Sequence, residues 1–459
     1  MTEKNIDAVI MKFITSSRKF DFADSFANYL QTSGYELNLG ATNSLLQWYF
    51  EISKKTELSE DIRKYILNTH DSLCDKYKVL DYNTAERLLH ALCAIDEWKK
   101  SVKLLDDIHL SSTPSHSAYS TIIATLFKNN KNVEAFRIIK KSLSDNRPLL
   151  DNAYDEWIKY ILRKYKDKKT ILKYLFELCL HLAQNNVTVT EATAARIKET
   201  FISLGWLVNY TSVRRASAQC NCCKNKLNEI HFTDEEFNFL QQTVKDRLIV
   251  GSDLFLKTSP EELERFMKFI NTTGPYDVVL DGLNIAYTIG NGSYVEKIKT
   301  INMVVDYFLK LNKKVLLLGR KHMHKWHAPT LKQISSKTFT FFTDDVSQDD
   351  PYFITAAILS GPNTDIVSRD LLRGHKFILK NEKLRLLFQK WQWKHQWMIL
   401  STRKKPVIQA PLQYEPCAQK YEGGWHIPYG KAEIVETDKS YINNGDPDCS
   451  AWLCLREQK

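Results

Sequence analysis

The first 205 residues carry an amphipathic helical pattern that repeats about every 35 residues, with little glycine and hardly any strand signal. TAERLLHALC from Thr84 aligns with YSTIIATLFK from Tyr119 and with YDEWIKYILR from Tyr154, and SVKLLDDI from Ser101 aligns with AFRIIKKSL from Ala135. A poorer copy runs through ADSFANYLQ and TNSLLQWYF. Because one helix pair cannot bury its apolar face alone, this pattern predicts a solenoid of stacked helix pairs with a concave surface.

The repeat resembles the pentatricopeptide repeat, whose units each face one nucleotide of single-stranded RNA. The alternative is a protein-binding array such as a tetratricopeptide solenoid. The formal net charge of +10, from 64 basic and 54 acidic side chains, favours a polyanionic partner. The copies are too degenerate for a base code to be read from them.

Composition sets further bounds. A chain of 459 residues with 43% hydrophobic residues is long enough for two or three domains with their own cores. No apolar stretch reaches the length that spans a bilayer. Nine cysteines, an odd number and mostly single, favour a reducing compartment. The first residues, MTEKNIDAVI, contain acids and match neither a secretory signal nor a clear transit peptide.

Past Gly205 the stretch QCNCCKNKL places Cys220 and Cys223 at the C-x-x-C spacing of a zinc knuckle. A tight turn between two such thiolates lets both reach one tetrahedral ion. Cys222 has the wrong spacing to join them. The alternative is a set of free cysteines near a surface turn.

One C-x-x-C pair supplies half of a zinc site, so two further ligands are needed. The best candidates lie near the other end of the chain, at His426 in GGWHIPYG and Cys454 in SAWLCLREQK, with Cys449 as the competitor of Cys454. A zinc ion held by both flanks would join the segments before and after the region between them.

In that region, residues 252–405, strand and helix patterns alternate, which predicts a mostly parallel sheet flanked by helices. The expected strands are VVLDG, KVLLLG, TFTFFTD and DIVSRD, and the expected helices are SPEELERFMKFINTT, VEKIKTINMVVDYFLKL and PYFITAAILSG.

Acidic residues occur where these segments end. Asp281 closes the first strand, Asp349 and Asp350 stand before PYFITAAILSG, and Asp370 ends DIVSRD, five residues before His375. Each acid has a structural alternative: a turn residue at Asp281 or Asp370, and a helix cap in the Asp-Pro pair. Four acids at one sheet edge would repel one another unless divalent cations bind them.

Two such cations can activate a water and stabilise a leaving oxygen in phosphodiester cleavage. Asp344 and Asp345 are a second acidic pair, ranked lower because they end a strand instead of opening a helix. Gly282 is expected to leave room for an RNA backbone, and Asn284 to orient a water or a neighbouring carboxylate.

VVLDGLNIAY, DDPYF, SRDLLRGH, the C-x-x-C pair, WHIP and WLC occur in this order behind degenerate repeats. The whole chain resembles the protein-only RNase P family, most closely its animal mitochondrial members. The resemblance implies a multidomain fold: an all-α pentatricopeptide-repeat RNA-binding domain at 1–204, a two-part zinc-binding central domain at 205–251 and 406–459, and an α/β PIN-like metallonuclease domain of the NYN type at 252–405.

The resemblance also implies the site residues. The family's four metal-binding aspartates fall on Asp281, Asp349, Asp350 and Asp370, and its following histidine falls on His375. The cofactor would be Mg²⁺ or Mn²⁺. The structural zinc ligands fall on Cys220, Cys223, His426 and Cys454. The stretch between WHIP and WLC is longer than usual in the family, which keeps Cys449 as an alternative.

The implied reaction is endonucleolytic removal of 5′ leaders from precursor tRNA, leaving a 5′-phosphate on the tRNA. The implied setting is the mitochondrial matrix, with no membrane association and with two partners, a tRNA methyltransferase subunit and a short-chain dehydrogenase-like subunit. The alternatives are an NYN endonuclease for other structured RNA and a non-catalytic RNA-binding scaffold. The presence of all four acids argues against the scaffold.

Overall fold

The computed structural model describes residues 5–17, 19–32, 37–249, 260–290, 292–344, 350–369, 382–400, 407–430 and 450–458. The described residues divide into two compact units. The first holds residues up to 181 together with 189–206, and the second holds 182–188, 207–429 and 450–458. Each unit is considered by itself.

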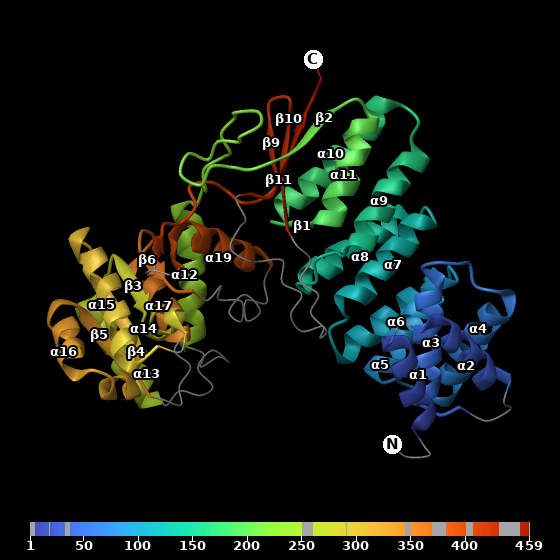
Figure 1. The fold of residues 1–459 in the computed structure, drawn as a ribbon, viewed down its shortest axis with the longest axis horizontal. Helices are drawn as coiled ribbons and strands as arrows, with labels where there is room; N and C mark the ends of the chain where they lie inside the picture. The colour runs from blue at the N-terminus through green and yellow to red at the C-terminus, as the bar shows by residue number, and fades with distance from the viewer. Residues whose placement is uncertain are drawn as a thin grey trace. The chain divides into compact units, whose positions relative to one another are not determined.

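The first unit is helical, as the sequence pattern predicts. Figure 1 shows its helices packed in successive layers along the chain. Its elements are α1 (Ile6–Ser16), α2 (Phe20–Thr32), α3 (Leu39–Ser53), α4 (Glu60–Lys76), α5 (Tyr82–Ala94), α6 (Trp98–Ser111), α7 (His116–Lys128), α8 (Asn132–Ser144), α9 (Asp151–Lys164), α10 (Lys168–Gln184), β1 (Val189–Thr190) and α11 (Glu191–Ser203).

The repeat is visible in how its helices begin and end. Asp81 and Ser115 cap α5 and α7 by accepting from the backbone N–H three residues on. Asp96 and Asn130 follow the ends of the same two helices with positive φ angles of 64° and 58°. Asp and Asn tolerate this left-handed conformation better than other side chains do, and it terminates a helix. Equivalent turns therefore recur at 34-residue spacing.

The first helix of each helix-pair repeat packs on the first helix of the next repeat, in the order α1, α3, α5, α7, α9. TNSLLQWYF thus belongs to a first helix, α3. ADSFANYLQ lies in α2, which is the second helix of the preceding pair. The poorer copy is therefore not a single repeat: its two segments are the second helix of one repeat and the first helix of the next.

The second unit contains a six-stranded sheet in the order β5-β4-β3-β6-β7-β8. Its first five strands are parallel, and β8 is antiparallel to β7. The strands are β3 (Val278–Asp281), β4 (Val315–Arg320), β5 (Phe339–Thr343), β6 (Asp365–Val367), β7 (Gln396–Leu400) and β8 (Val407–Gln409). The helices are α12 (Asp234–Ile249), α13 (Pro260–Thr273), α14 (Gly282–Ala286), α15 (Tyr294–Lys310), α16 (Ala328–Lys337), α17 (Asp350–Ser360) and α19 (Glu382–His395), with 3-10 helices η2 (Tyr287–Ile289) and η3 (Lys321–Lys325).

Helices cover both faces of this sheet (Figure 1). On one face Val278 and Leu280 pack with α14, α15 and α16. On the other face Val279 packs with α12, α13, α17 and α19. Successive strand residues point to opposite faces, so a central strand covered on both sides must be apolar throughout. All four residues of β3 are buried, which explains the unbroken run VVL before Asp281.

A smaller antiparallel sheet holds the two ends of this unit together. Within the second unit it contains β2 (Leu207–Thr211), β9 (Gln419–Tyr421), β10 (Gly424–Gly430) and β11 (Trp452–Arg456), with β11 between β2 and β10. Its core includes Val213, Leu227, Tyr414 and Trp452, and Trp393 of α19 packs against it.

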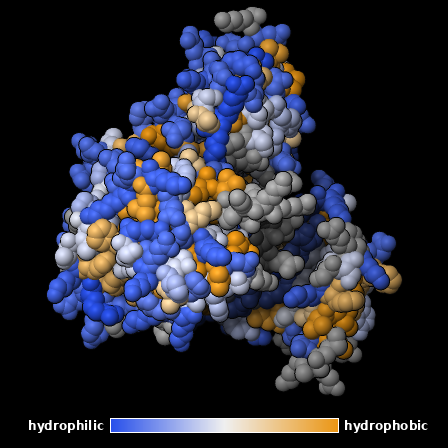
Figure 2. All heavy atoms as spheres, turned by 60° about the vertical axis from the view of Figure 1, so that its left-hand side comes forward, coloured by the Kyte–Doolittle hydropathy of each residue, from blue (hydrophilic) through white to orange (hydrophobic). Residues whose placement is uncertain are grey.

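The expected fold class is confirmed: a helical repeat region, an α/β region and a small region with a Cys/His cluster. The strands β7 and β8 and the helix α19 were not predicted. Among the described residues, no helix combines the length and apolarity needed to cross a bilayer. Hydrophilic residues dominate the face drawn in Figure 2, and hydrophobic side chains form only small groups on it.

Candidate functional site

Asp281 ends the buried strand β3 and caps the short helix α14. Its side chain is only 5% exposed. Asp281 Oδ1 accepts from the backbone N–H of Asn284 at 3.0 Å, and Oδ2 accepts from Asn284 Nδ2 at 2.5 Å. Asp281 was expected to be either a turn residue or a metal-binding carboxylate. It caps a helix, and its carboxylate is held in a fixed position at the end of β3. The prediction that Asn284 orients a neighbouring carboxylate is confirmed.

Gly282 follows Asp281 at the point where β3 and β4 lie closest. A Cβ at Gly282 would lie 2.6 Å from Leu318 O and 3.3 Å from Met323 Cε. The space beside this residue is thus filled by β4 and η3. The expectation that Gly282 leaves room for RNA is wrong, because the glycine instead permits close packing of the two backbones.

Ser368 holds Asp281 from the neighbouring strand. It directly follows β6, is fully buried, and its Oγ donates to Asp281 Oδ2 at 3.0 Å. The carbonyl of Ser368 accepts from Gln396 Nε2 at 2.9 Å, and Gln396 Oε1 accepts from Gln392 Nε2 at 2.6 Å. A buried chain of hydrogen bonds from α19 and β7 therefore fixes both Ser368 and the carboxylate.

The other predicted acids are placed only in part. Asp350 is the first residue of α17, and α17 packs on β3, the strand that carries Asp281. The side chain of Asp350 and the residues Asp349, Asp370 and His375 lie outside the described residues. Convergence of the four acids remains a prediction.

Of the lower-ranked pair, Asp344 directly follows β5 and Asp345 lies outside the described residues. The Asp344 carboxylate forms an ion pair with Lys321, and its backbone N–H donates to Glu262 Oε1 at 2.5 Å. Asp344 thus ties η3 and α13 to the end of β5, and these contacts account for it structurally.

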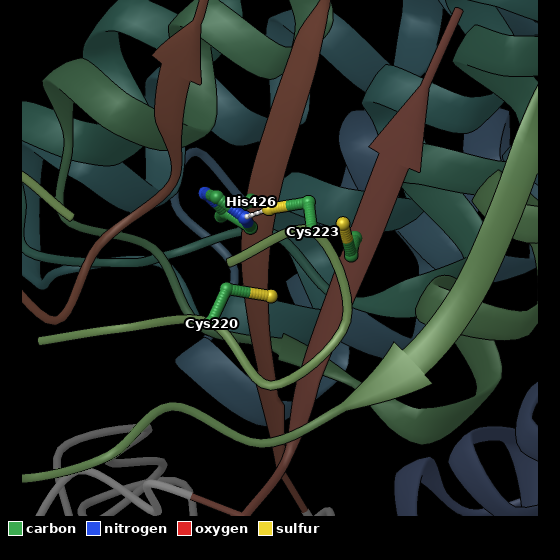
Figure 3. A group of neighbouring side chains, drawn as sticks. Cys220, Cys223 and His426 are labelled. Carbon is green, nitrogen blue, oxygen red and sulfur yellow. Dashed lines mark hydrogen bonds between the residues drawn. The ribbon is translucent and has the colours of Figure 1, made fainter. Parts of the chain in front are cut away.

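A second site lies on the small sheet. The ligand atoms of Cys220, Cys223, His426 and Cys454 all lie within 4.8 Å of one another, although about 200 residues separate the first pair from His426. Figure 3 shows Cys220 and Cys223 on one loop, with their sulfurs turned toward the His426 ring. The Cys223 Sγ to His426 Nε2 distance is 3.2 Å.

The sheet register explains this convergence. His426 on β10 lies directly opposite Cys454 on β11, and directly opposed residues point to the same face of a sheet. The Cys220 loop turns back on itself, with the Cys220 carbonyl accepting from the Lys224 N–H at 3.1 Å. Lys224 has a positive φ of 66°, which closes the turn.

The thiols influence one another. Hydrogen bonds from Cys454 and from His426 lower the pKa of Cys220. The hydrogen bond between Cys454 and Cys220, together with burial, raises the pKa of Cys454. Closely spaced thiolates repel one another, so a cation bound among these cysteines would favour their deprotonated forms.

The donor set fits zinc. Four ligands at 2.3 Å from a tetrahedral ion lie about 3.8 Å from one another, so small side-chain shifts within the observed cluster suffice. Cys222 is not in the group, and Cys449 lies outside the described residues.

Sequence reasoning missed two supporting residues. Ser368 was not singled out, although it stands two positions before Asp370 in SRD. Tyr421 stacks on His426 with ring centroids 4.5 Å apart, and its hydroxyl donates to Leu455 O at 3.0 Å. The available signal was the sequence YEGG, in which two glycines directly after Glu422 indicate a tight hairpin that pairs Tyr421 with Gly424.

Comparisons with known proteins agree with one another. The family model for protein-only RNase P matches residues 215–454. The mitochondrial ribonuclease P catalytic subunit of Mus musculus is 30% identical over 406 residues, which cover 86% of this chain and 67% of that protein. The corresponding subunit of Rattus norvegicus is 29% identical, covering 98% of this chain and 75% of the other.

Among solved structures, the nuclear proteinaceous RNase P 2 of Arabidopsis thaliana matches with a TM-score of 0.57. The match covers 100% of both chains at 16% sequence identity. At this identity the match shows that the fold is shared over the full length, and it carries no residue roles.

Proposed function

The chain belongs to the protein-only RNase P family, and on that premise we propose that it is an endoribonuclease that removes 5′ leaders from precursor tRNA. The observation that supports this most is the extent of the family match. Residues 215–454 contain Asp281 and its hydrogen-bond network as well as all four members of the Cys/His cluster.

The reaction is hydrolysis of one phosphodiester. Water oxygen bonds to phosphorus, the bond from phosphorus to the 3′-oxygen of the last leader nucleotide breaks, and that oxygen takes up a proton. The tRNA keeps the 5′-phosphate and the leader leaves with a 3′-hydroxyl. Asp281 contributes a carboxylate that is rigid before substrate arrives, because Oδ1 accepts from the Asn284 backbone N–H and Oδ2 accepts from Asn284 Nδ2 and Ser368 Oγ.

The proposed cation ligands are Asp281, Asp349, Asp350 and Asp370, with Mg²⁺ or Mn²⁺ as the ion. Bound there, such ions would lower the pKa of an attacking water and stabilise the departing 3′-oxygen. His375 is proposed to assist at the same site. Cys220, Cys223, His426 and Cys454 are proposed to hold a structural Zn²⁺ that takes no part in cleavage, since four protein ligands leave no open position.

The decisive experiment incubates the full chain with a precursor tRNA and maps the ends of the products. The expected outcome is a single cut that yields a mature tRNA with a 5′-phosphate. A cut elsewhere in structured RNA would favour the alternative NYN nuclease, and binding without any cut would favour the scaffold. The assay runs with and without a tRNA methyltransferase and a short-chain dehydrogenase-like protein.

Weak activity of the isolated chain is the expected result of that comparison. Four closely spaced carboxylates would repel one another, so we propose that a partner protein or the substrate helps to bring the other three acids to the cations beside Asp281. Full-rate, correctly placed cleavage by the chain alone would show that no partner is needed. A mitochondrial location is proposed from the names of the two rodent relatives; imaging of the tagged, full-length gene product tests it.

A further inference from the structure

A group of exposed aromatic rings lies just beyond Asp281 along the chain. Tyr287 opens η2 directly after α14, and Tyr294 opens α15. The two rings are 48% and 57% exposed. Tyr294 stacks on Trp326 with centroids 5.5 Å apart and 14° between the ring planes, and Tyr287 meets the same indole edge-on at 6.4 Å. We call Tyr287, Tyr294 and Trp326 the aromatic surface.

The aromatic surface is bordered by positive charge. The ammonium of Lys297, a side chain only 7% exposed, lies 3.9 Å from the Tyr287 ring centroid and 5.5 Å from that of Tyr294. A cation held this deeply polarises both rings. Residues 320–327, RKHMHKWH, carry three cationic and three histidine side chains and no acid. Of these, the His322 ring lies 5.9 Å from Trp326.

The surface is near the cleavage carboxylate. Tyr287 lies six residues after Asp281, roughly 9 Å at the rise of a helix. On the other side η3, which leads into Trp326, follows β4, whose Leu318 pairs with Asp281. Met323 of η3 lies against Gly282, so the segment that carries Trp326 packs on the backbone that positions the carboxylate.

We propose that the aromatic surface binds the single-stranded 5′ leader of the substrate by stacking its unpaired bases, beside the carboxylate that serves the cut. The inference rests on the proposed function. Exposed aromatic rings with adjacent cations recognise unpaired bases without sequence preference. Bases in the acceptor stem are already stacked inside a duplex and offer no free face. The leader is the unpaired strand attached to the scissile phosphate, so it is the part of the substrate that fits.

The test measures how much the leader adds to affinity. The full chain carrying Asp281→Asn, which is expected to slow cleavage, is titrated with a precursor tRNA and with the matching mature tRNA. Any partner proteins are the same in every arm. Adding Tyr294→Ala should weaken precursor binding about ten-fold and leave mature tRNA binding unchanged. Tyr294→Phe keeps the ring and should keep the affinity.

Two controls make the result specific. Tyr307→Ala removes a partly exposed tyrosine from the far end of the same helix, roughly 20 Å away, and should have no effect. A precursor with abasic sites in its leader should bind the protein with Tyr294 intact as weakly as the ordinary precursor binds the Tyr294→Ala variant. Combining the abasic leader with Tyr294→Ala should cause no further loss of affinity.

Equal losses on precursor and mature tRNA would overturn the inference and point to the tRNA body, as would additive effects of Tyr294→Ala and abasic sites. No loss on either RNA would also overturn it and leave a protein partner as the occupant. Cleavage by the chain with Asp281 intact is scored separately, so a protein that cuts correctly while ignoring its leader refutes only this inference.

Discussion

Asp281 combines two roles within one carboxylate. Oδ1 caps α14 through the N–H of Asn284, while Oδ2 accepts from Asn284 and Ser368. The cap orients the residue along the chain, and Ser368 orients it across the sheet. A carboxylate held from two directions loses little freedom when a cation binds, because its conformational entropy has already been lost on folding.

Replacing Asp281 with Asn tests the catalytic role separately from the capping role. Asn caps a helix as well as Asp does, so Asp281→Asn should keep the start of α14, although its amide nitrogen cannot accept from Asn284 Nδ2 and Ser368 Oγ. Loss of the charge should slow cleavage by roughly a hundred-fold or more, about 3 kcal/mol, with precursor tRNA binding nearly kept. Single-turnover rates and binding isotherms measure the two effects.

Asp344→Asn, which breaks the pair with Lys321, is the matched control and should cut at nearly the parent rate. If Asp344→Asn abolishes cleavage while Asp281→Asn does not, the wrong acid was chosen.

Ser368→Ala should act through Asp281 and not through the fold as a whole. Losing a hydrogen bond to a metal-binding carboxylate typically costs about 10- to 100-fold in metal affinity. The Mg²⁺ concentration for half-maximal cleavage should therefore rise, and saturating Mg²⁺ should restore most of the rate. Thr364→Val is the control, because its buried hydroxyl donates to Tyr276 O and not to Asp281. A rate loss that Mg²⁺ does not restore would contradict the positioning role.

At the scale of elements, the Cys/His cluster joins a loop to two strands. Cys220 and Cys223 lie on the loop after β2, His426 on β10 and Cys454 on β11. Within the second unit the cluster therefore ties the chain before the α/β sheet to the chain after it. The contact of Trp393 with the core of the small sheet makes a second tie between the same parts.

Cys223→Ser should lower zinc content and thermal stability together, because a structural zinc contributes its binding free energy to folding. We expect Tm to fall by about 5 °C or more, measured by calorimetry alongside elemental analysis. Cys222→Ser is the control and should change neither. If Cys449→Ser releases the metal while Cys454→Ser does not, the fourth ligand is misassigned; metal-free protein with the parent Tm would refute the site.

The repeat helices should lose stability in mild acid. Burial, with smaller effects from Arg87 and Lys54, lowers the pKa of His90 from 6.5 to about 3. The unfolded chain therefore takes up the proton first, so this contribution is complete above pH 6.5 and is lost as the pH falls toward 3. His90→Gln, which does not titrate, should flatten the dependence of urea midpoint on pH in this window. An unchanged slope would show that other groups dominate.

Some elements could be predicted from the sequence because local and tertiary signals agree. The unbroken aliphatic run before Asp281 predicts a strand covered on both faces, and the amphipathic helical pattern that recurs about every 35 residues predicts a repeat. The strand β7 was missed because it begins directly after α19, and residues 382–400 contain no Gly, Pro, Asn or Asp to mark the boundary. Ser368 was missed because a serine after a strand usually makes only a turn, and its contact with Asp281 joins residues 87 positions apart.

At the scale of the whole molecule, we expect the helical unit to contribute most to RNA recognition and the α/β unit to carry the cleavage site. All the predicted metal-binding residues lie after residue 206, outside the first unit. The match to the family model likewise starts at residue 215. A solenoid offers an extended surface to a large ligand, whereas one cleavage site needs only the phosphodiester and its immediate neighbours. We expect most of the tRNA affinity to come from the helical unit.

Removing residues 1–206 tests this division, because the remaining chain starts at the first residue of β2. The truncated protein should keep its zinc and most of its secondary structure, since the six-stranded sheet, the strands β2, β9, β10 and β11 and the Cys/His cluster lie within residues 207–459. Its affinity for precursor tRNA should fall by orders of magnitude. The slope of log affinity against log salt should also become shallower, because a protein without the helical unit neutralises fewer phosphates and so releases fewer counterions on binding. Affinities are measured at several salt concentrations, and zinc content is the control for folding. An unchanged slope and an unchanged affinity in a folded fragment would place RNA recognition in the α/β unit itself.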